Sequence, residues 1–296
     1  MDTKIDWSEV SFAQQQRLRF IESALIWEGS IQRKRVCDVF KVNANHVTKD
    51  YHLYKNHFPK ALEYNPSSRA YEPGINFKPV LAKEDPAEYL ALLLAYSHSK
   101  SDSILPVLGT DALHVEIIPQ PSVSVNSDIL KQILQATRHG TGLEIVYQSM
   151  SSAKNKERVV WPHALIYTGT QWHIRAFDSA YDQFRNFAIQ RIEKIQPVNV
   201  NRDISPDLDT EWHTFERVEI TPHPELNEYQ QALVAHEYGM RWQAGQWIWT
   251  VDIRRCLVGY FAVNYRLDLP GDNPLRDRIV LRNKKAISKY FFNETS

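Results

Sequence analysis

The chain has 296 residues, 43% of them hydrophobic and 24% charged, which leaves room for two or three domains with buried cores. Its 35 basic and 35 acidic residues give a formal net charge of +0, so a surface that binds nucleic acid must be local. The two cysteines, Cys37 and Cys256, are too few for a disulfide framework or a thiolate zinc site. The beginning of the chain has no apolar signal core, and the apolar run Tyr89–Tyr96 is far shorter than the ~20 residues of a membrane helix. We therefore expect a cytoplasmic protein without membrane contact.

The first 75 residues predict a winged helix-turn-helix domain. Ser11 can cap a first helix, in which Leu18, Ile21 and Leu25 share one buried face. The residues between the two expected strands, Asn65-Pro-Ser-Ser68, are typical of a turn. The expected elements are helices over about 11–28, 31–40 and 44–56 and strands over 62–64 and 69–71.

Positive charge is concentrated on this predicted domain. Residues 30–60 hold seven Lys or Arg against Asp38 and Asp50, a local net charge of 7 − 2 = +5. Such a surface suits the phosphate backbone of DNA, and the polar side of the third helix could reach base edges in a major groove. The predicted DNA-binding residues are Arg33, Lys34, Asn45, His46, Thr48, Lys49 and His52 on the helices and Ser67, Ser68 and Arg69 in the wing.

A basic face is also compatible with a solvated three-helix bundle that binds nothing. The order of three helices and a hairpin, with the charge on the second and third helices, favours DNA binding. Because one helix-turn-helix reads only a few base pairs, we expect a homodimer on a pseudo-palindromic, double-stranded operator.

Residues 76–126 are predicted to be a connector or dimerisation segment, which packs on its neighbours or on a partner chain. A helix can run from Asp85-Pro86 through Tyr96, and Leu113–Ile118 is typical of a strand. Ser127 can cap a further helix that ends near Gly140.

From Leu143 the hydrophobic period changes to two, and close-spaced strands with short polar turns predict a small antiparallel β-barrel over residues 127–200. After Pro197 the composition is that of a linker, and the acidic stretch Asp207–Glu228 is predicted to be a solvated linker surface. Residues 210–296 mix both patterns and predict a small α+β domain. The expected strands are 143–149, 158–167, 171–178, 183–189, 218–221, 247–251 and 278–281, and the expected helices are 225–237, 253–265 and 284–292.

The segment Gly169–Asp178 carries a resemblance to a known family. It resembles the signature of WYL domains, although Trp172-His173-Ile174 departs from Trp-Tyr-Leu at two positions, and Arg185-Asn-Phe187 with Gln190-Arg191-Ile192 follows at the expected spacing. With the winged domain before it, the whole chain resembles three-part WYL regulators of the BrxR/CapW type, which are associated with anti-phage defence. The resemblance implies an α+β multidomain protein with an Sm-like WYL barrel, a C-terminal WCX domain, homodimerisation, and control of transcription, usually repression.

The resemblance also implies a basic pocket in the WYL domain that binds a nucleotide or nucleic-acid effector. Guanidinium groups give forked hydrogen bonds to phosphate, which suits such a ligand. The alternative is that Arg175 and Arg191 pair with Asp178 or Glu193 and that His163 is an ordinary strand histidine. His173 stands where the family usually has a tyrosine hydroxyl. The predicted effector-binding residues are Tyr147, Ser149, His163, Arg175, Arg185 and Arg191.

No catalytic constellation is present in the sequence. It has no phosphate-binding glycine loop, no Gly-x-Ser-x-Gly and no His-Glu-x-x-His. His46, His52 and His57 do not share one helical face, so we expect no metal site. Since the catalytic motifs are also missing, we expect no cofactor and no enzymatic activity.

The favoured hypothesis is a homodimeric repressor of a defence operon whose operator affinity depends on the effector. The alternative is a non-transcriptional accessory protein of a defence complex that senses RNA, single-stranded DNA or a nucleotide, with a winged domain that contacts proteins.

Overall fold

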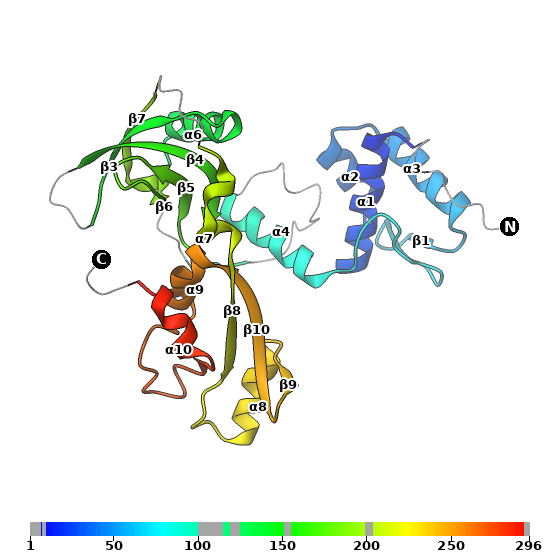
Figure 1. The fold of residues 1–296 in the computed structure, drawn as a ribbon. Coiled ribbons are helices and arrows are strands. Elements are labelled where there is room, and N and C mark those ends of the chain that lie inside the picture. The colour runs from blue at the N-terminus through cyan, green and yellow to red at the C-terminus, as the bar shows by residue number, and fades with distance from the viewer. Residues whose placement is uncertain are drawn as a thin grey trace. The chain divides into compact units, whose positions relative to one another are not determined.

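The computed structural model describes residues 7, 10–99, 115–118, 125–150, 155–198 and 204–292. The chain divides into two compact units, residues 1–119 and 120–296, which we call the N-terminal and C-terminal units (Figure 1). Among the described residues, no helix is both long and apolar enough to cross a membrane. The predicted α+β multidomain fold is confirmed, with a winged helix domain, a central antiparallel sheet where a small barrel was predicted, and a C-terminal α+β domain.

The N-terminal unit has the predicted order of three helices and a hairpin. Ser11 caps the first helix as predicted, and that helix contacts the other two and the second strand. Residues 115–118, expected to belong to a strand, are not in one, and residues 113 and 114 lie outside the described part of the chain. The elements are α1 (Phe12–Trp27), α2 (Arg33–Phe40), α3 (Ala44–His57), β1 (Leu62–Asn65), β2 (Ala70–Pro73) and α4 (Pro86–Ser99).

A buried carboxylate ties the chain after the hairpin to α1. Glu22 is 0% exposed and accepts a hydrogen bond from the Tyr54 hydroxyl at 2.8 Å. The backbone N–H groups of Val80, Leu81 and Ala82 also donate to this carboxylate, at distances between 2.7 and 3.1 Å. Because a buried charge is tolerated only when its hydrogen bonds are satisfied, these donors must stay in place around Glu22. Residues 80–82 are thereby held against α1 and α3.

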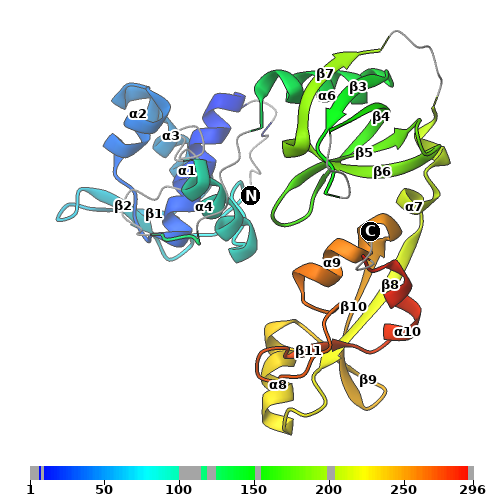
Figure 2. The ribbon, with the colours of Figure 1, turned by 90° about the vertical axis from the view of Figure 1, so that its left-hand side faces the viewer.

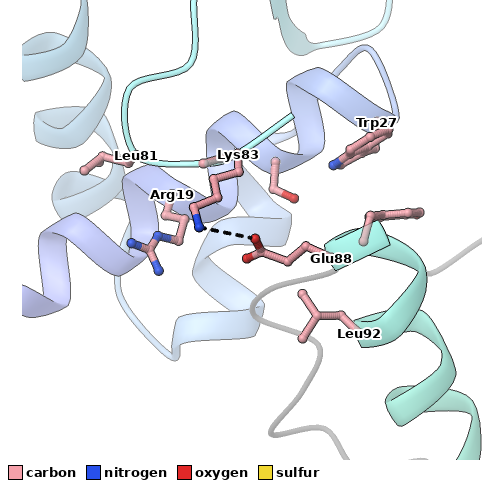
Figure 3. Close-up of a pocket in the computed structure, with 9 residues that line it drawn as sticks. Arg19, Trp27, Leu81, Lys83, Glu88 and Leu92 are labelled. Atoms are coloured by element: carbon pink, nitrogen blue, oxygen red, sulfur yellow. Dashed lines mark ion pairs between the residues drawn. The ribbon is translucent and has the colours of Figure 1, made fainter. Parts of the chain in front are cut away.

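α4 rests on α1 mainly at its first turn. The rings of Trp27 and Tyr89 stack with centroids 4.8 Å apart, beside a small cavity of about 170 Å³ where Lys83 and Glu88 lie 3.9 Å apart (Figure 3). Among the side chains described for α4 none is buried, and Leu90 is 60% exposed. The dimerisation role expected for segment 76–126 stays a prediction.

The C-terminal unit begins with α6 (Ser127–His139), which packs on a five-stranded antiparallel sheet of order β6-β5-β4-β3-β7. Four strands are those predicted, but the fifth, β7, was missed because its sequence Ile-Glu-Lys-Ile-Gln-Pro has only Ile192 buried. The cap of α6 is Asn126 rather than Ser127, since the Asn126 side chain accepts from two backbone N–H groups. The strands are β3 (Leu143–Tyr147), β4 (Lys156–Tyr167), β5 (Trp172–Asp178), β6 (Gln183–Ala188) and β7 (Ile192–Pro197).

The rest of the unit is the predicted α+β domain, in which β8 and β10 run from α7 toward α8 (Figure 2). Its sheet has the order β11-β8-β10-β9, and α8 packs on β8 and β10. The elements are η2 (Pro206–Leu208), α7 (Thr210–His213), β8 (Phe215–Pro222), α8 (Glu228–Glu237), β9 (Arg241–Gln243), β10 (Gln246–Arg254), η3 (Arg255–Leu257), α9 (Val258–Asn264), β11 (Ile279–Leu281), α10 (Lys284–Ile287) and η4 (Ser288–Tyr290).

Two helix predictions in this domain were wrong at their boundaries. The helix expected from Ile253 begins only at Val258, because β10 continues to Arg254, where it pairs with Phe215 of β8. The helix expected over 284–292 is the short α10 followed by a 3₁₀ turn.

The Glu22 contacts generate the first test. We expect Glu22→Gln to destabilise the N-terminal unit by about 2–3 kcal/mol, because an amide cannot accept from all the donors that face the carboxylate. The amides of residues 80–82 should exchange faster in hydrogen-exchange measurements. Glu88→Gln, which removes an exposed ion pair of the same unit, serves as the control and should change stability by less than about 0.5 kcal/mol. Equal protection of the 80–82 amides in both variants would contradict the anchoring role.

Candidate nucleic-acid interface and effector site

A groove of about 830 Å³ lies between α2, α3 and the β1–β2 hairpin; we call it the basic groove. None of its described lining residues is acidic, whereas Arg33, Lys34 and Arg69 are cationic, so the groove is suited to an anion. The lining residues are Gln32, Arg33, Lys34, Cys37, Ala44, Thr48, Tyr51, Tyr64, Arg69 and Tyr71.

Nine of the ten predicted DNA-binding residues are exposed, and Thr48 is half-buried. Four of the ten line the basic groove: Arg33, Lys34, Thr48 and Arg69. The other six lie along α3 and at the hairpin turn: Asn45, His46, Lys49, His52, Ser67 and Ser68. The structure therefore places the whole set on α2, α3 and the hairpin that border one groove.

Hydrogen bonds hold the three elements around the groove in register. The Arg33 guanidinium donates to the Thr48 hydroxyl at 3.2 Å, which joins α2 to α3. The Gln32 side chain donates to the Ser68 carbonyl at 3.3 Å, which joins the start of α2 to the hairpin. Arg69 follows with a φ of 53°, a left-handed conformation that non-glycine residues adopt rarely. The wing is thus positioned by the helices rather than by its own turn alone.

Ion pairs inside the domain change how much some charged residues of segment 30–60 contribute to the charge of this surface. Asp50 is 1% exposed and paired with Arg17 at 2.6 Å, so its charge is neutralised inside the domain. Arg35 is likewise paired, with Glu28. Sequence reasoning missed Gln32 and Tyr64 as groove residues, although the alternation of side chains along a hairpin strand could have indicated Tyr64.

The predicted effector site is centred on Arg175, which the structure pairs with an acidic residue from the following segment. The Arg175 guanidinium donates to both oxygens of Asp209, at 2.7 and 2.8 Å, and to Glu211 at 3.0 Å. His163 Nε2 lies 2.9 Å from the same Asp209 carboxylate. Arg175 and Asp209 are 3% and 1% exposed. The prediction that residues 207–228 form a solvated linker surface was therefore wrong, because Asp209 is buried against the sheet.

This cluster, Arg175 with His163 and Asp209, is an anion site whose bound anion is a side chain. Burial alone would raise the pKa of Asp209, but hydrogen bonds from Arg175 and His163 hold it well below its usual range. The forked contact has the geometry by which arginine binds carboxylate or phosphate. A cavity of about 340 Å³, lined also by Phe177 and Phe184, adjoins the pair. The expected alternative partner of Arg175, Asp178, instead accepts from Arg158 at 3.3 Å.

The remaining predicted effector residues do not bind the Asp209 carboxylate in the described part of the chain, although Tyr147 and Arg191 lie near Tyr260, as Arg175 does. Arg185 lies 3.9 Å from Asp178 and stacks over the Tyr181 ring at 4.4 Å. The Tyr147 hydroxyl accepts from the Ala188 amide at 3.1 Å, and Ser149 and Arg191 are half-buried. The structure thus brings together only two of the six residues, Arg175 and His163, around one carboxylate.

Burial favours the uncharged form of two titratable side chains, His173 and Cys256. His173, at the position of the usual tyrosine, is buried with its ring 5.1 Å from that of Tyr260, and burial lowers its pKa, so the imidazole is neutral at pH 7. Burial raises the pKa of the Cys256 thiol to about 11, which keeps it protonated and poorly reactive.

Three domain models match the chain in the order seen in the structure. The winged helix-turn-helix domain of the BrxR transcriptional regulator matches residues 13–95, and the WYL domain matches residues 128–197. The C-terminal dimerization domain of BrxR matches residues 215–287.

Two relatives match this chain almost end to end. The DNA-binding transcriptional repressor CapW of Pseudomonas aeruginosa is 31% identical over 278 residues, which are 93% of this chain and 91% of that protein. CapW of Stenotrophomonas maltophilia is 30% identical over 291 residues, 96% and 94% of the two chains. Among solved structures, PafBC of Arthrobacter aurescens covers 94% of this chain and 46% of that chain at 16% identity and a TM-score of 0.29. The chain therefore belongs to the BrxR/CapW family of DNA-binding transcriptional repressors, which are regulators and not enzymes.

Proposed function

We propose that two copies of this chain bind a pseudo-palindromic operator, each reading one half-site with α3 and the β1–β2 hairpin, and so repress a defence operon. The observation that carries the proposal is the basic groove, which has no acidic residue among its described lining and is bordered by the exposed polar face of α3. The relatives named as DNA-binding repressors and the match to a dimerization domain support it. Two-fold symmetry of the protein then predicts two-fold symmetry of the operator.

We further propose that the cluster of Arg175 and His163 senses an anionic effector, a nucleotide or nucleic acid. Since the Asp209 carboxylate already binds both Arg175 and His163, such an effector must exchange with it. The segment that carries Asp209 also contacts the next domain, because Trp212 lies between the His163 ring and the Arg254 guanidinium, at 5.4 and 4.2 Å. Displacing Asp209 would therefore loosen the entry into β8 and the dimerization domain. Coupling of this kind is reciprocal, so the effector must bind less well to the operator complex if it weakens operator binding.

One observation favours the alternative of a single-strand sensor. Tyr167 and Trp172 are 54% and 46% exposed at neighbouring ends of β4 and β5, with ring centroids 5.0 Å apart. Exposed aromatic rings of this kind are platforms on which unpaired bases stack. A preference for single-stranded over duplex oligonucleotides of equal length would support this function in place of the operator.

Operator binding can be tested by mobility shifts with the DNA upstream of the gene. Lys49→Gln should weaken binding and reduce the slope of log K against log salt by about 0.9, because one phosphate contact is lost. Lys131→Gln removes a lysine whose side chain is 68% exposed on α6, far along the chain from α3, and should leave both quantities unchanged. Binding that is independent of sequence at every salt concentration would exclude an operator.

Effector exchange can be tested with adenosine monophosphate and a short oligothymidylate as probes. Asp209→Asn keeps the shape of the side chain but removes the competing charge, so at least one probe should bind several-fold more tightly, as measured by calorimetry. Arg175→Gln should abolish probe binding, so the operator affinity of this variant should no longer respond to either probe.

Glu211→Gln is the matched control, because Glu211 contacts the same guanidinium but its side chain is 51% exposed. It should change probe binding much less than Asp209→Asn does. Probe binding by a folded Arg175→Gln variant that equals that of the wild type would show that this cluster is not the effector site.

A further inference from the structure

Tyr51 lines the basic groove, and among the described residues of the N-terminal unit its hydroxyl is the buried side-chain polar atom without a hydrogen-bond partner. It is 2% exposed, and its hydroxyl has no hydrogen-bond partner among the described residues. Tyr54, three residues later on α3, is equally buried but donates to Glu22 at 2.8 Å. Two buried tyrosines of the same helix thus differ in whether the hydroxyl has a hydrogen-bond partner.

The hydroxyl of Tyr51 is not needed for packing. Its ring contacts the ring of Tyr71 with centroids 4.0 Å apart, and the ring also belongs to the core of the N-terminal unit. A phenylalanine would make these contacts as well. A buried hydroxyl without a hydrogen-bond partner destabilises the folded state. The Tyr51 hydroxyl therefore lowers the stability of the free protein without making a compensating interaction within it.

The surroundings indicate what kind of partner the hydroxyl would take. Burial raises the pKa of Tyr51, so the group stays protonated and offers a hydrogen to an acceptor. Arg33, Lys34 and Arg69 line the same groove, and none of the other lining residues that the structure describes is acidic, so the acceptor should be anionic. A groove of about 830 Å³ has room for a stretch of sugar-phosphate chain. Hydroxyl groups of tyrosine are common donors to phosphate oxygens at protein–DNA interfaces.

We propose that the Tyr51 hydroxyl donates a hydrogen bond to a phosphate of bound DNA, so that the basic groove anchors the backbone while the exposed face of α3 reads bases. The inference rests on the proposed function, in which the N-terminal unit binds an operator. It makes Tyr51 a DNA-contacting residue, whereas the spacing of α3 marks it only as a core position.

The test compares Tyr51→Phe with Tyr54→Phe in the full chain. Tyr51→Phe should leave the N-terminal unit as stable or more stable, measured by the urea dependence of hydrogen exchange in α3. It should weaken binding about tenfold, to the upstream operator and to a scrambled duplex alike, because a phosphate contact carries no base information. Tyr54→Phe should do the reverse, lowering stability through the loss of the bond to Glu22 and leaving DNA affinity within about twofold.

Three results would overturn the proposal while leaving operator binding intact. Tyr51→Phe could bind DNA as the wild type does, which would remove the contact. It could lose affinity only for the operator, which would make the contact one to a base. It could destabilise the unit as much as Tyr54→Phe does, which would make the hydroxyl structural. If instead the wild type shows no preference for its upstream DNA and Lys49→Gln changes nothing, the proposed function fails and this inference fails with it.

Discussion

The buried pair of Arg175 and Asp209 is the interaction on which the C-terminal unit depends. Each partner would be costly to bury alone, so the sheet that carries Arg175 and the segment that carries Asp209 stabilise each other only in contact. His163 also binds Asp209, and its ring contacts the ring of Trp212. The Trp212 ring in turn contacts the guanidinium of Arg254 at the end of β10. An anion site, a domain junction and the route to the dimerization domain therefore coincide at one carboxylate.

In the N-terminal unit the buried carboxylate of Glu22 has a similar role. It accepts hydrogen bonds from the Tyr54 hydroxyl and from the backbone after the hairpin, and so holds both against α1. The buried acidic side chains of this unit thus have partners within it. The cationic side chains of Arg33, Lys34 and Arg69 instead line the basic groove at the surface. The unpartnered hydroxyl of Tyr51 stands out against that background. This unit pairs Asp50 with Arg17 and hydrogen-bonds Glu22 internally, yet it leaves the Tyr51 hydroxyl unpaired at a groove lined by three cations, which suits the anionic partner we propose.

The sequence predicted the parts of the site that depend on local pattern. Amphipathic spacing in residues 44–56 placed Val47 and Tyr54 inside and Lys49 and His52 outside, as the structure has them. The pattern failed where a strand has little hydrophobic signal, as in β7, and where a strand runs directly into a helix, as at Arg254. It also failed at Asp209, since nothing local separates that residue from the exposed Asp207 two positions earlier.

The amino-acid sequence by itself therefore determined the order of elements, the faces they bury and the concentration of positive charge around α2 and α3. Only the tertiary structure decided which polar groups are satisfied, because their partners come from distant positions. Arg175 and Asp209 are 34 residues apart, and Tyr54 and Glu22 are 32 apart. Hydrophobic periodicity indicates whether a side chain is buried, but it carries no information on the partner of a buried hydroxyl or charge. The function proposed for this chain rests on those partners.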